Sequence, residues 1–147
     1  MSLLSFLLLN SGAWCAGGPA EKPVVLLTEE EAAMGEEKVF GFSSSLPKDG
    51  PIIKVLQPKV DSDLHTPFKL HVRFIPKEGS EVNLASLKVE ALKIVNVNIT
   101  PRLLPYAAKD GIKMDNVTIP SGRHRIRVTI LDTLGRETQE IFAIHVI

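Results

Sequence analysis

The chain has 147 residues, enough for one domain, and its seventeen Lys and Arg balance its seventeen Asp and Glu. A neutral chain is unlike nucleic-acid-binding proteins, whose affinity depends on neutralising phosphates, so we expect no nucleic-acid partner. Hydrophobic residues make up 44% of the chain and charged residues 23%, which is typical of a globular protein and excludes a disordered one.

The first twenty residues carry no charge and have the pattern of a secretory signal. Residues 3–9 form an apolar run, shorter than the roughly 20 residues that a membrane-spanning helix needs, and small residues follow as far as Ala20. We predict a signal peptide over residues 1–20, no transmembrane span after its removal, and a periplasmic or secreted protein. Cleavage after Cys15 is the alternative site. Because no Lys or Arg precedes the apolar run, a buried N-terminal strand or helix is the alternative structure.

Cleavage after Ala20 would leave a chain without Cys or Trp. Such a chain can form no disulfide and no thiolate metal site, and it has no thiol nucleophile. Exported proteins without disulfides are more common in bacteria than in animal secretion, which favours the bacterial envelope.

Charge divides the rest of the chain near residue 49. Residues 21–48 carry a net charge of −3, whereas residues 49–147 carry a net charge of +3. Gly, Ser and Pro are frequent after residue 36, as is typical of a linker. We therefore predict an acidic linker over residues 21–48 and a folded domain over residues 49–147.

The acidic linker contains two local signals. Thr28, with Glu31 three residues later, is a capping box that predicts a short helix ending at Gly35. The apolar run Val24–Leu27 predicts a strand that docks on the domain. This strand either covers the edge of the last strand, Glu137–Ile147, or leaves that edge open as a recognition surface.

From residue 52 onward, apolar and polar residues alternate, which predicts strands with one buried and one solvated face. Seven segments have this pattern: Ile52–Leu56, Phe68–Phe74, Leu87–Ile94, Val95–Ile99, Ile112–Ile119, Ile126–Ile130 and Phe142–Val146. Seven short strands in about a hundred residues predict an all-β, two-sheet antiparallel sandwich.

Two connections have specific turn signals. Thr100 as N-cap and Pro101 at the first helical position predict one helical or 3₁₀ turn, ended by Gly111, that bridges strands at one end of the sandwich. Asp132 and Gly135 occupy the first and fourth positions of a type I turn, which predicts a three-residue hairpin loop. That loop pairs residue 132 with 136, and hence 126 with 142 and 124 with 144.

The sequence Ile-Pro-Ser-Gly-Arg-His at 119–124, the alternating strand after it, the Asp132-x-x-Gly135 turn and the closing strand resemble bacterial immunoglobulin-like domains. Fibronectin type III-like modules are similar. The resemblance covers roughly residues 50–147 and implies an immunoglobulin-like sandwich of about seven strands, although the core Cys pair and Trp of antibody domains are missing. A leader followed by a helix at 27–33 and one such domain is similar to small exported bacterial proteins.

Catalytic and metal sites have weak support. The four histidines (His65, His71, His124 and His145) include no closely spaced ligand pair, and Ser121 near His124 is explained by an ordinary Pro-Ser-Gly turn. Turn formation likewise explains the aspartates at 61, 63, 110 and 115 better than calcium binding does. We therefore expect no catalytic residue, no cofactor and no metal, and a protein that is not an enzyme. A small secreted hydrolase or metalloenzyme is the third hypothesis.

Sugar-binding modules usually stack pyranose rings on exposed aromatic side chains. Only Tyr106 and the linker pair Phe40 and Phe42 remain for this role, because the parity of the strands assigns the other aromatic residues after Ala20 to the core. An envelope polysaccharide-binding domain is therefore the second hypothesis.

The best candidate for a binding surface is a basic strip. Arg123, Arg125 and Arg127 line the outer face of one strand, and the predicted register places His145, Ala143 and Ile141 opposite them rather than acids. A solvated face is the simplest interpretation. As a binding surface, the strip suits an acidic protein, a polyanionic envelope polymer, a lipid headgroup or the chain's own acidic segment at 29–37. Our first hypothesis is a non-enzymatic exported module that binds a protein partner in the bacterial envelope, with Tyr106 as a further candidate contact.

Overall fold

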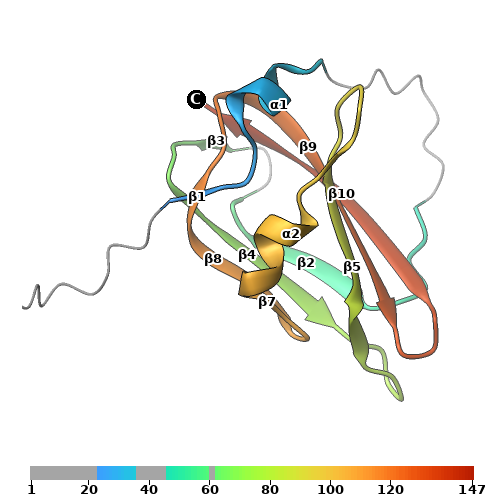
Figure 1. Ribbon diagram of the computed structural model, residues 1–147. Helices are drawn as coiled ribbons and strands as arrows, with labels where there is room; N and C mark the ends of the chain where they lie inside the picture. Colours follow the sequence, from blue (N-terminus) through green and yellow to red (C-terminus); the bar gives the residue numbers. More distant parts are fainter. Residues whose placement is uncertain (1–22, 36–45, 60–61) are drawn as a thin grey trace, which may run out of the picture.

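The alternating segments pair into two β-sheets that pack face to face, as the computed structural model shows for residues 23–35, 46–59 and 62–147 (Figure 1). The predicted signal peptide and its cleavage sites lie outside these residues. The first sheet has the order β1-β8-β4-β2, with β7 also beside β8, and the second has the order β3-β10-β9-β5-β6. The predicted β-sandwich is therefore confirmed.

The strands of the first sheet are β1 (Val24–Val25), β2 (Ile52–Gln57), β4 (Phe68–Ile75), β7 (Ala107–Ala108) and β8 (Gly111–Thr118). The strands of the second sheet are β3 (Asp63–Leu64), β5 (Val82–Ala91), β6 (Val97–Asn98), β9 (Gly122–Asp132) and β10 (Glu137–Val146). The helical segments are α1 (Glu29–Ala33), α2 (Thr100–Leu103) and the 3₁₀ turn η1 (Leu104–Tyr106).

The sheets are mixed, so the prediction of a purely antiparallel sandwich is wrong in this respect. β1 runs parallel to β8, and β3 runs parallel to β10. Both parallel strands have only two residues, which is too short for an alternating pattern to reveal them. Their partners are far away in the sequence, as parallel pairing requires.

The core lies between the sheets and follows the predicted parity. In β4, Phe68, Leu70, Val72 and Phe74 are buried, while the intervening residues are exposed or half-buried. The same alternation buries Ile126, Val128 and Ile130 of β9. The prediction fails between Leu87 and Ile99: β5 begins earlier, at Val82, and ends at Ala91, and β6 has only two residues. Ile94 and Val95 lie in the connecting loop, 71% and 66% exposed.

The predicted capping box of α1 is confirmed. The Glu31 amide donates to Thr28 Oγ1 at 3.2 Å, and the Thr28 amide donates to Glu31 Oε2 at 2.9 Å. The predicted turn after β6 is also present, but Ile99 rather than Thr100 is its N-cap. The Thr100 hydroxyl is engaged elsewhere, because it accepts a hydrogen bond from the Val89 amide at 2.8 Å.

The run Val24–Leu27 docks on the sandwich at a different place from the predicted one. Val24 and Val25 pair with Val117 and Thr118 of β8, so β1 covers an edge of the first sheet and not the edge of β10. Leu26 and Leu27 follow into the core and are 1% and 2% exposed. The first residues of the predicted linker therefore contribute to the hydrophobic core.

The predicted open edge of the last strand is covered at both of its ends. At one end of β10, β3 pairs with His145 and Val146. At the other end, Lys48 bridges to Thr138, and the Gln139 amide donates to the Pro47 carbonyl at 2.8 Å. A partner strand could therefore not pair along the whole length of β10, because both ends of this edge already have partners.

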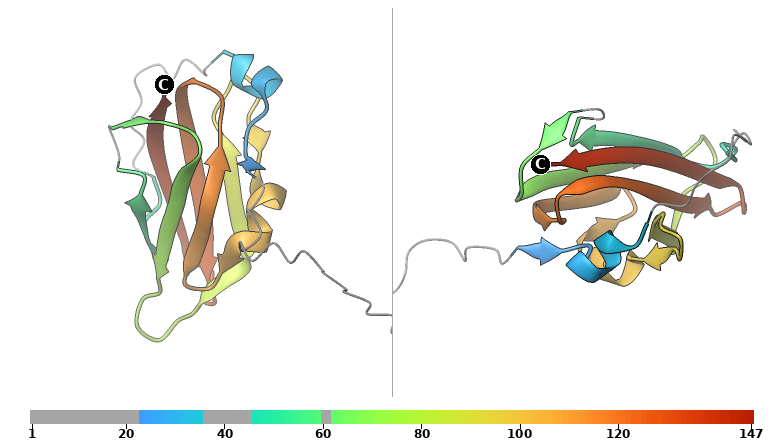
Figure 2. Two further views of the ribbon diagram at one scale, coloured as in Figure 1. Left: turned by 90° about the vertical axis from the view of Figure 1, so that its left-hand side faces the viewer. Right: turned by 90° about the horizontal axis from the view of Figure 1, so that it is seen from above.

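α1 and α2 lie along one side of the sandwich together with β1 (Figure 2). Arg102 of α2 binds Glu31 of α1 through two hydrogen bonds of 2.8 Å, and its Nη1 also donates to the Leu26 carbonyl at 2.8 Å. The hydrogen bonds from Arg102 outweigh the opposing effect of burial and, with the Thr28 amide and the charge of Arg102, lower the Glu31 pKa from 4.5 to about 2. One ion pair thus joins both helices to the docked N-terminal run.

We expect Leu26→Ala to destabilise the domain by about 2–5 kcal/mol, because it removes a buried side chain and leaves a cavity. Val25→Ala is the matched control. The Val25 side chain is 49% exposed, and its truncation should cost about 0.5 kcal/mol or less. Urea unfolding of both variants measures the difference. Equal losses would mean that residues 24–27 do not belong to the core.

The Glu31–Arg102 pair should make stability depend on pH. Because the Glu31 pKa is lower in the folded state, the pair stabilises the protein above pH 4.5, and this stabilisation disappears as the pH falls towards 2. We therefore expect Glu31→Gln to lower the free energy of unfolding at neutral pH and to have a shrinking effect below pH 4.5. Denaturant unfolding of both proteins across this range is the measurement. A difference between the two proteins that does not change with pH would contradict the ion pair.

Candidate functional site

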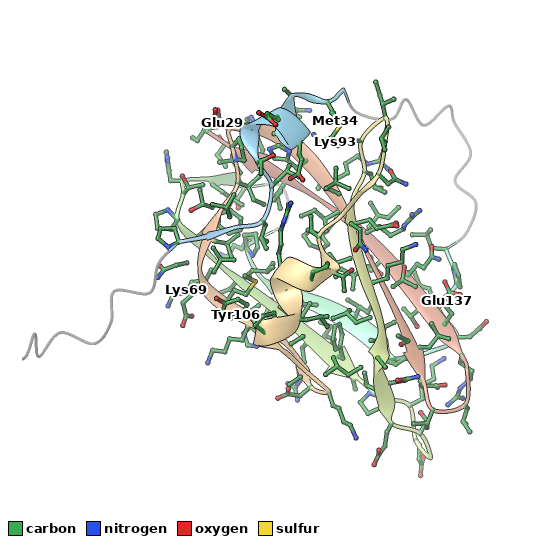
Figure 3. The ribbon with its side chains drawn as sticks, viewed as in Figure 1. Glu29, Met34, Lys69, Lys93, Tyr106 and Glu137 are labelled. Atoms are coloured by element: carbon green, nitrogen blue, oxygen red, sulfur yellow. The ribbon has the colours of Figure 1, made fainter. Side chains whose placement is uncertain are left out.

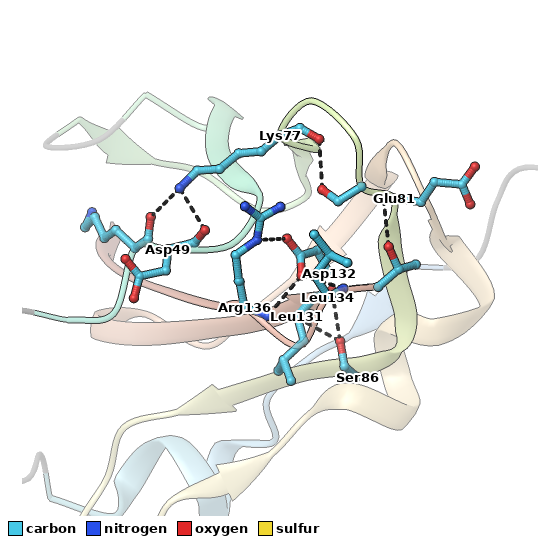
Figure 4. Close-up of polar contacts among 11 residues, drawn as sticks. Asp49, Lys77, Glu81, Ser86, Leu131, Asp132, Leu134 and Arg136 are labelled. Carbon is cyan, nitrogen blue, oxygen red and sulfur yellow. Dashed lines mark hydrogen bonds and ion pairs between the residues drawn. The ribbon is translucent and has the colours of Figure 1, made fainter.

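The β9–β10 hairpin carries the candidate site, and its register is the predicted one. Ile126 pairs with Phe142, His124 with Ile144 and Arg123 with His145. At the turn, the buried Asp132 carboxylate accepts hydrogen bonds from the Leu134 amide, the Arg136 amide and Arg136 Nε, at 2.7–2.9 Å (Figure 4). Burial would raise the Asp132 pKa, but these hydrogen bonds and the Arg136 charge hold it below its ordinary value.

The outer face of this hairpin contains a hollow of about 430 Å³. Its lining residues come from three neighbouring strands of the second sheet: Asp63 of β3, Arg123, His124 and Arg125 of β9, and Ala143, Ile144 and His145 of β10. Four of the outward side chains that sequence analysis placed opposite one another, Arg123, Arg125, Ala143 and His145, are thus brought together.

Asp63 is the member of the site that sequence analysis did not connect to it. β3 pairs with the end of β10 so that Asp63 lies beside His145, and His145 Nδ1 is 2.8 Å from Asp63 Oδ1. Because an ionised carboxylate only accepts hydrogen bonds, Nδ1 is the protonated nitrogen of this contact. Asp63 therefore fixes the orientation of the His145 ring and leaves Nε2 as its other polar atom.

Arg127 does not share this environment, although it follows the same outward alternation. It forms an ion pair with Glu90 of β5, which also binds Lys88 at 2.9 Å. Burial would raise the Glu90 pKa, but the hydrogen bonds and charges of Lys88 and Arg127 lower it. The expectation that no acid neutralises the strip therefore does not hold at Arg127. The neutralising acid comes from the strand on the other side of β9, whose register sequence analysis had not predicted.

Arg123 and Arg125 differ from Arg127, because no acidic side chain among the described residues pairs with them. Within the described part of the chain, neither forms an ion pair, whereas Arg102, Arg127 and Arg136 each bind a carboxylate. A guanidinium group presents several donors in a plane and binds carboxylates or other oxyanions well. The wall of the hollow formed by β9 is therefore suited to an anionic group.

Tyr106 is not part of this site. It lies in η1, beside α2 and β7 on the side of the sandwich, where its side chain is 40% exposed (Figure 3). No Phe, Tyr or Trp is among the described residues that line the hollow on β9 and β10. The structure thus separates the predicted basic contacts from the predicted aromatic contact.

A buried lysine lies behind the site. Lys93 is 2% exposed, and its Nζ is 3.3 Å from Nδ1 of His124, which points inward from β9 between Arg123 and Arg125. His124 Nε2 is 2.8 Å from the Pro120 carbonyl, which can only accept. Nε2 therefore carries the proton of the neutral ring, and Nδ1 accepts from Lys93. Sequence analysis missed Lys93 because it interrupts an apolar run that looked like a strand.

The other candidate residues are not assembled into a site. His65 is exposed and His71 is half-buried on the first sheet, and no cluster of three or more His, Cys, Asp or Glu side chains in the described residues could hold a metal ion. The His124 ring binds the Pro120 carbonyl and Lys93, as described above. Within residues 23–35, 46–59 and 62–147, no helix is long and apolar enough to cross a membrane.

Comparison with known proteins gives no family. No protein-family model matches the chain, and no curated protein matches it. Among solved structures, the chain is similar to CopC from Methylosinus trichosporium OB3b, with 12% identity and a TM-score of 0.43 over 65% of this chain and 92% of that one. It is also similar to an engineered protein, with 12% identity and a TM-score of 0.44 over 66% of this chain and 20% of that one.

We expect Lys93→Met to destabilise the protein by about 1–3 kcal/mol, because it removes the donor that the buried Nδ1 of His124 faces while nearly preserving side-chain volume. Lys88→Met is the control, since its side chain is 57% exposed and its loss should cost about 0.5 kcal/mol. Thermal and urea unfolding measure both variants. A Lys93→Met protein as stable as the Lys88→Met protein would contradict a stabilising role for the buried contact.

Proposed function

We propose that this chain is an exported, non-enzymatic immunoglobulin-like module that binds an acidic protein partner in the bacterial envelope. The apolar run at residues 3–9 and the small residues up to Ala20 support export to the periplasm or the medium. The strand pattern and the turn at 132–135 support the immunoglobulin-like or fibronectin type III-like assignment. The described lining of the hollow includes basic side chains but no nucleophilic side chain beside a base, which supports a role in binding rather than in catalysis.

The observation that carries the proposal is the pair of arginines on β9. Arg123 and Arg125 face one hollow of about 430 Å³ without an acidic partner among the described residues, while Arg127 on the same strand is neutralised. A solvated face accounts for isolated cations. Two neighbouring guanidinium groups beside a hollow are better explained by an anionic ligand.

The opposite wall of the hollow restricts the ligand further. Asp63 holds His145 there, so a carboxylate of this protein lies across from the two arginines. A suitable ligand would place an anionic group beside the arginines of β9 and a hydrogen-bond donor beside the Asp63 carboxylate of β3. A peptide with acidic side chains and backbone amides has both kinds of group, which favours a protein partner over a simple polyanion.

We expect an acidic poly-glutamate peptide to shift the amide NMR signals of residues 123–125 and 143–145, and to bind more weakly as salt rises. Arg125→Gln should weaken binding at least tenfold, because a hydrogen bond to a charged group contributes about 1.5–3 kcal/mol. Arg127→Gln is the matched control, with the same change of charge on the same strand, and should change the affinity less than twofold.

Equal losses in Arg125→Gln and Arg127→Gln, or signal shifts far from β9 and β10, would contradict the proposed site. Polygalacturonate provides the comparison with the second hypothesis. If it binds more tightly than the peptide and its binding depends on Tyr106, the polysaccharide-binding alternative is the better one.

A further inference from the structure

The outer face of the first sheet, opposite the candidate site, carries a second group of cations. β2, β4 and β8 lie side by side on this face (Figure 2, left). Their inward residues form the core, and their outward positions include four exposed cations: Lys54 of β2, Lys69 and Arg73 of β4, and Lys113 of β8. We call these four residues the basic face. Lys69 marks its position in Figure 3.

The register places like charges on this face next to one another. Lys54 is directly opposite Arg73 on the neighbouring strand. Residues opposite each other on one face of an antiparallel pair are about 5 Å apart at Cβ, where like charges destabilise the sheet. The arrangement is therefore unfavourable for the isolated domain, and an anionic surface would relieve it.

Within the described residues, no acid forms an ion pair with these cations. Asp115 is the only acid at an outward position of the three strands. On the outer face of the second sheet, Lys88, Arg127 and His145 bind carboxylates, which leaves Arg123 and Arg125 as the cations without an ion pair among its described strand residues. The basic face is thus the more extensive region of unbalanced positive charge.

Apolar side chains accompany the cations. Ile52 and Leu56 lie at outward positions of β2 and are 48% and 45% exposed. Leu56 also lines a hollow of about 350 Å³ together with Pro58, Leu64 and Phe68, and Lys59 and Lys69 belong to the same lining. The face therefore offers apolar contact next to positive charge.

We propose that the basic face is a docking surface for a lipid bilayer with anionic headgroups. The cations are spread over three strands of one sheet face and do not converge on one hollow, which matches an extended charged surface better than a single acidic side chain. Exposed aliphatic residues between the cations suit the boundary of headgroups and acyl chains. The proposal is independent of the proposed function, because it concerns the opposite sheet and different residues.

Vesicle flotation tests the proposal. The protein should float with phosphatidylcholine vesicles that contain phosphatidylglycerol, should not float with pure phosphatidylcholine vesicles, and should be released by salt. Each Lys or Arg near an anionic bilayer strengthens adsorption about fivefold, so the double variant Lys69→Gln/Lys113→Gln should bind roughly 25-fold more weakly. The matched control, Arg123→Gln/Arg125→Gln, removes the same charge from the other sheet and should change vesicle binding less than twofold.

All four substituted side chains lie on outer faces of the sheets, so both double variants should keep the circular dichroism spectrum and Tm of the parent, which confirms that they fold. The proposal is overturned if the protein does not bind the anionic vesicles, if it binds pure phosphatidylcholine equally well, or if the two double variants lose the same affinity. Binding of soluble poly-glutamate by the basic face without vesicle binding would assign the face to an acidic protein instead. None of these results changes the peptide test at β9 and β10.

Discussion

The register of the β9–β10 hairpin is the constraint on which the rest of the molecule depends. Side chains of a strand alternate between its faces, so a shift of one residue would move the apolar residues of β9 to solvent and its arginines into the core. The turn prevents such a shift, because the carboxylate of Asp132 binds two backbone amides and the side chain of Arg136 within one loop. The hydrogen bonds of this one turn thus determine which side chains of β9 face the core and which face the candidate binding surface.

Much of the sandwich could be predicted because its signals are local. The alternation in β4, β8, β9 and β10, the capping box of α1 and the turn at Asp132 each depend on residues within a few positions of one another. Predictions failed where a distant partner decides the structure. Thr100 looked like an N-cap, but Val89 of β5 uses its hydroxyl. β1 and β3 are two-residue strands that exist only because β8 and β10 lie beside them.

The same distinction applies to the candidate site. Arg123, Arg125 and His145 could be grouped from the sequence, because one hairpin register brings them together. Asp63 and Glu90 could not be assigned, since they belong to strands whose pairing with β10 and β9 the sequence pattern does not specify. These two acids nevertheless decide which basic residues remain unneutralised. Lys93 is a further case, because a lysine within an apolar run gives no indication that His124 faces it.

The docking of Val24–Leu27 has a consequence for how the chain folds. β1 pairs with Val117 and Thr118, and Leu26 and Leu27 complete a core whose other members lie between residues 53 and 146. These contacts have a high sequence separation, and topologies rich in such contacts fold slowly because long loops must close before the contacts form. On a ribosome, this run is made before β8 and must wait for β8 before it can pair. Two consecutive leucines and two valines therefore stay without their native partners until β8 has been synthesised, so this early segment is among the last to reach its native contacts.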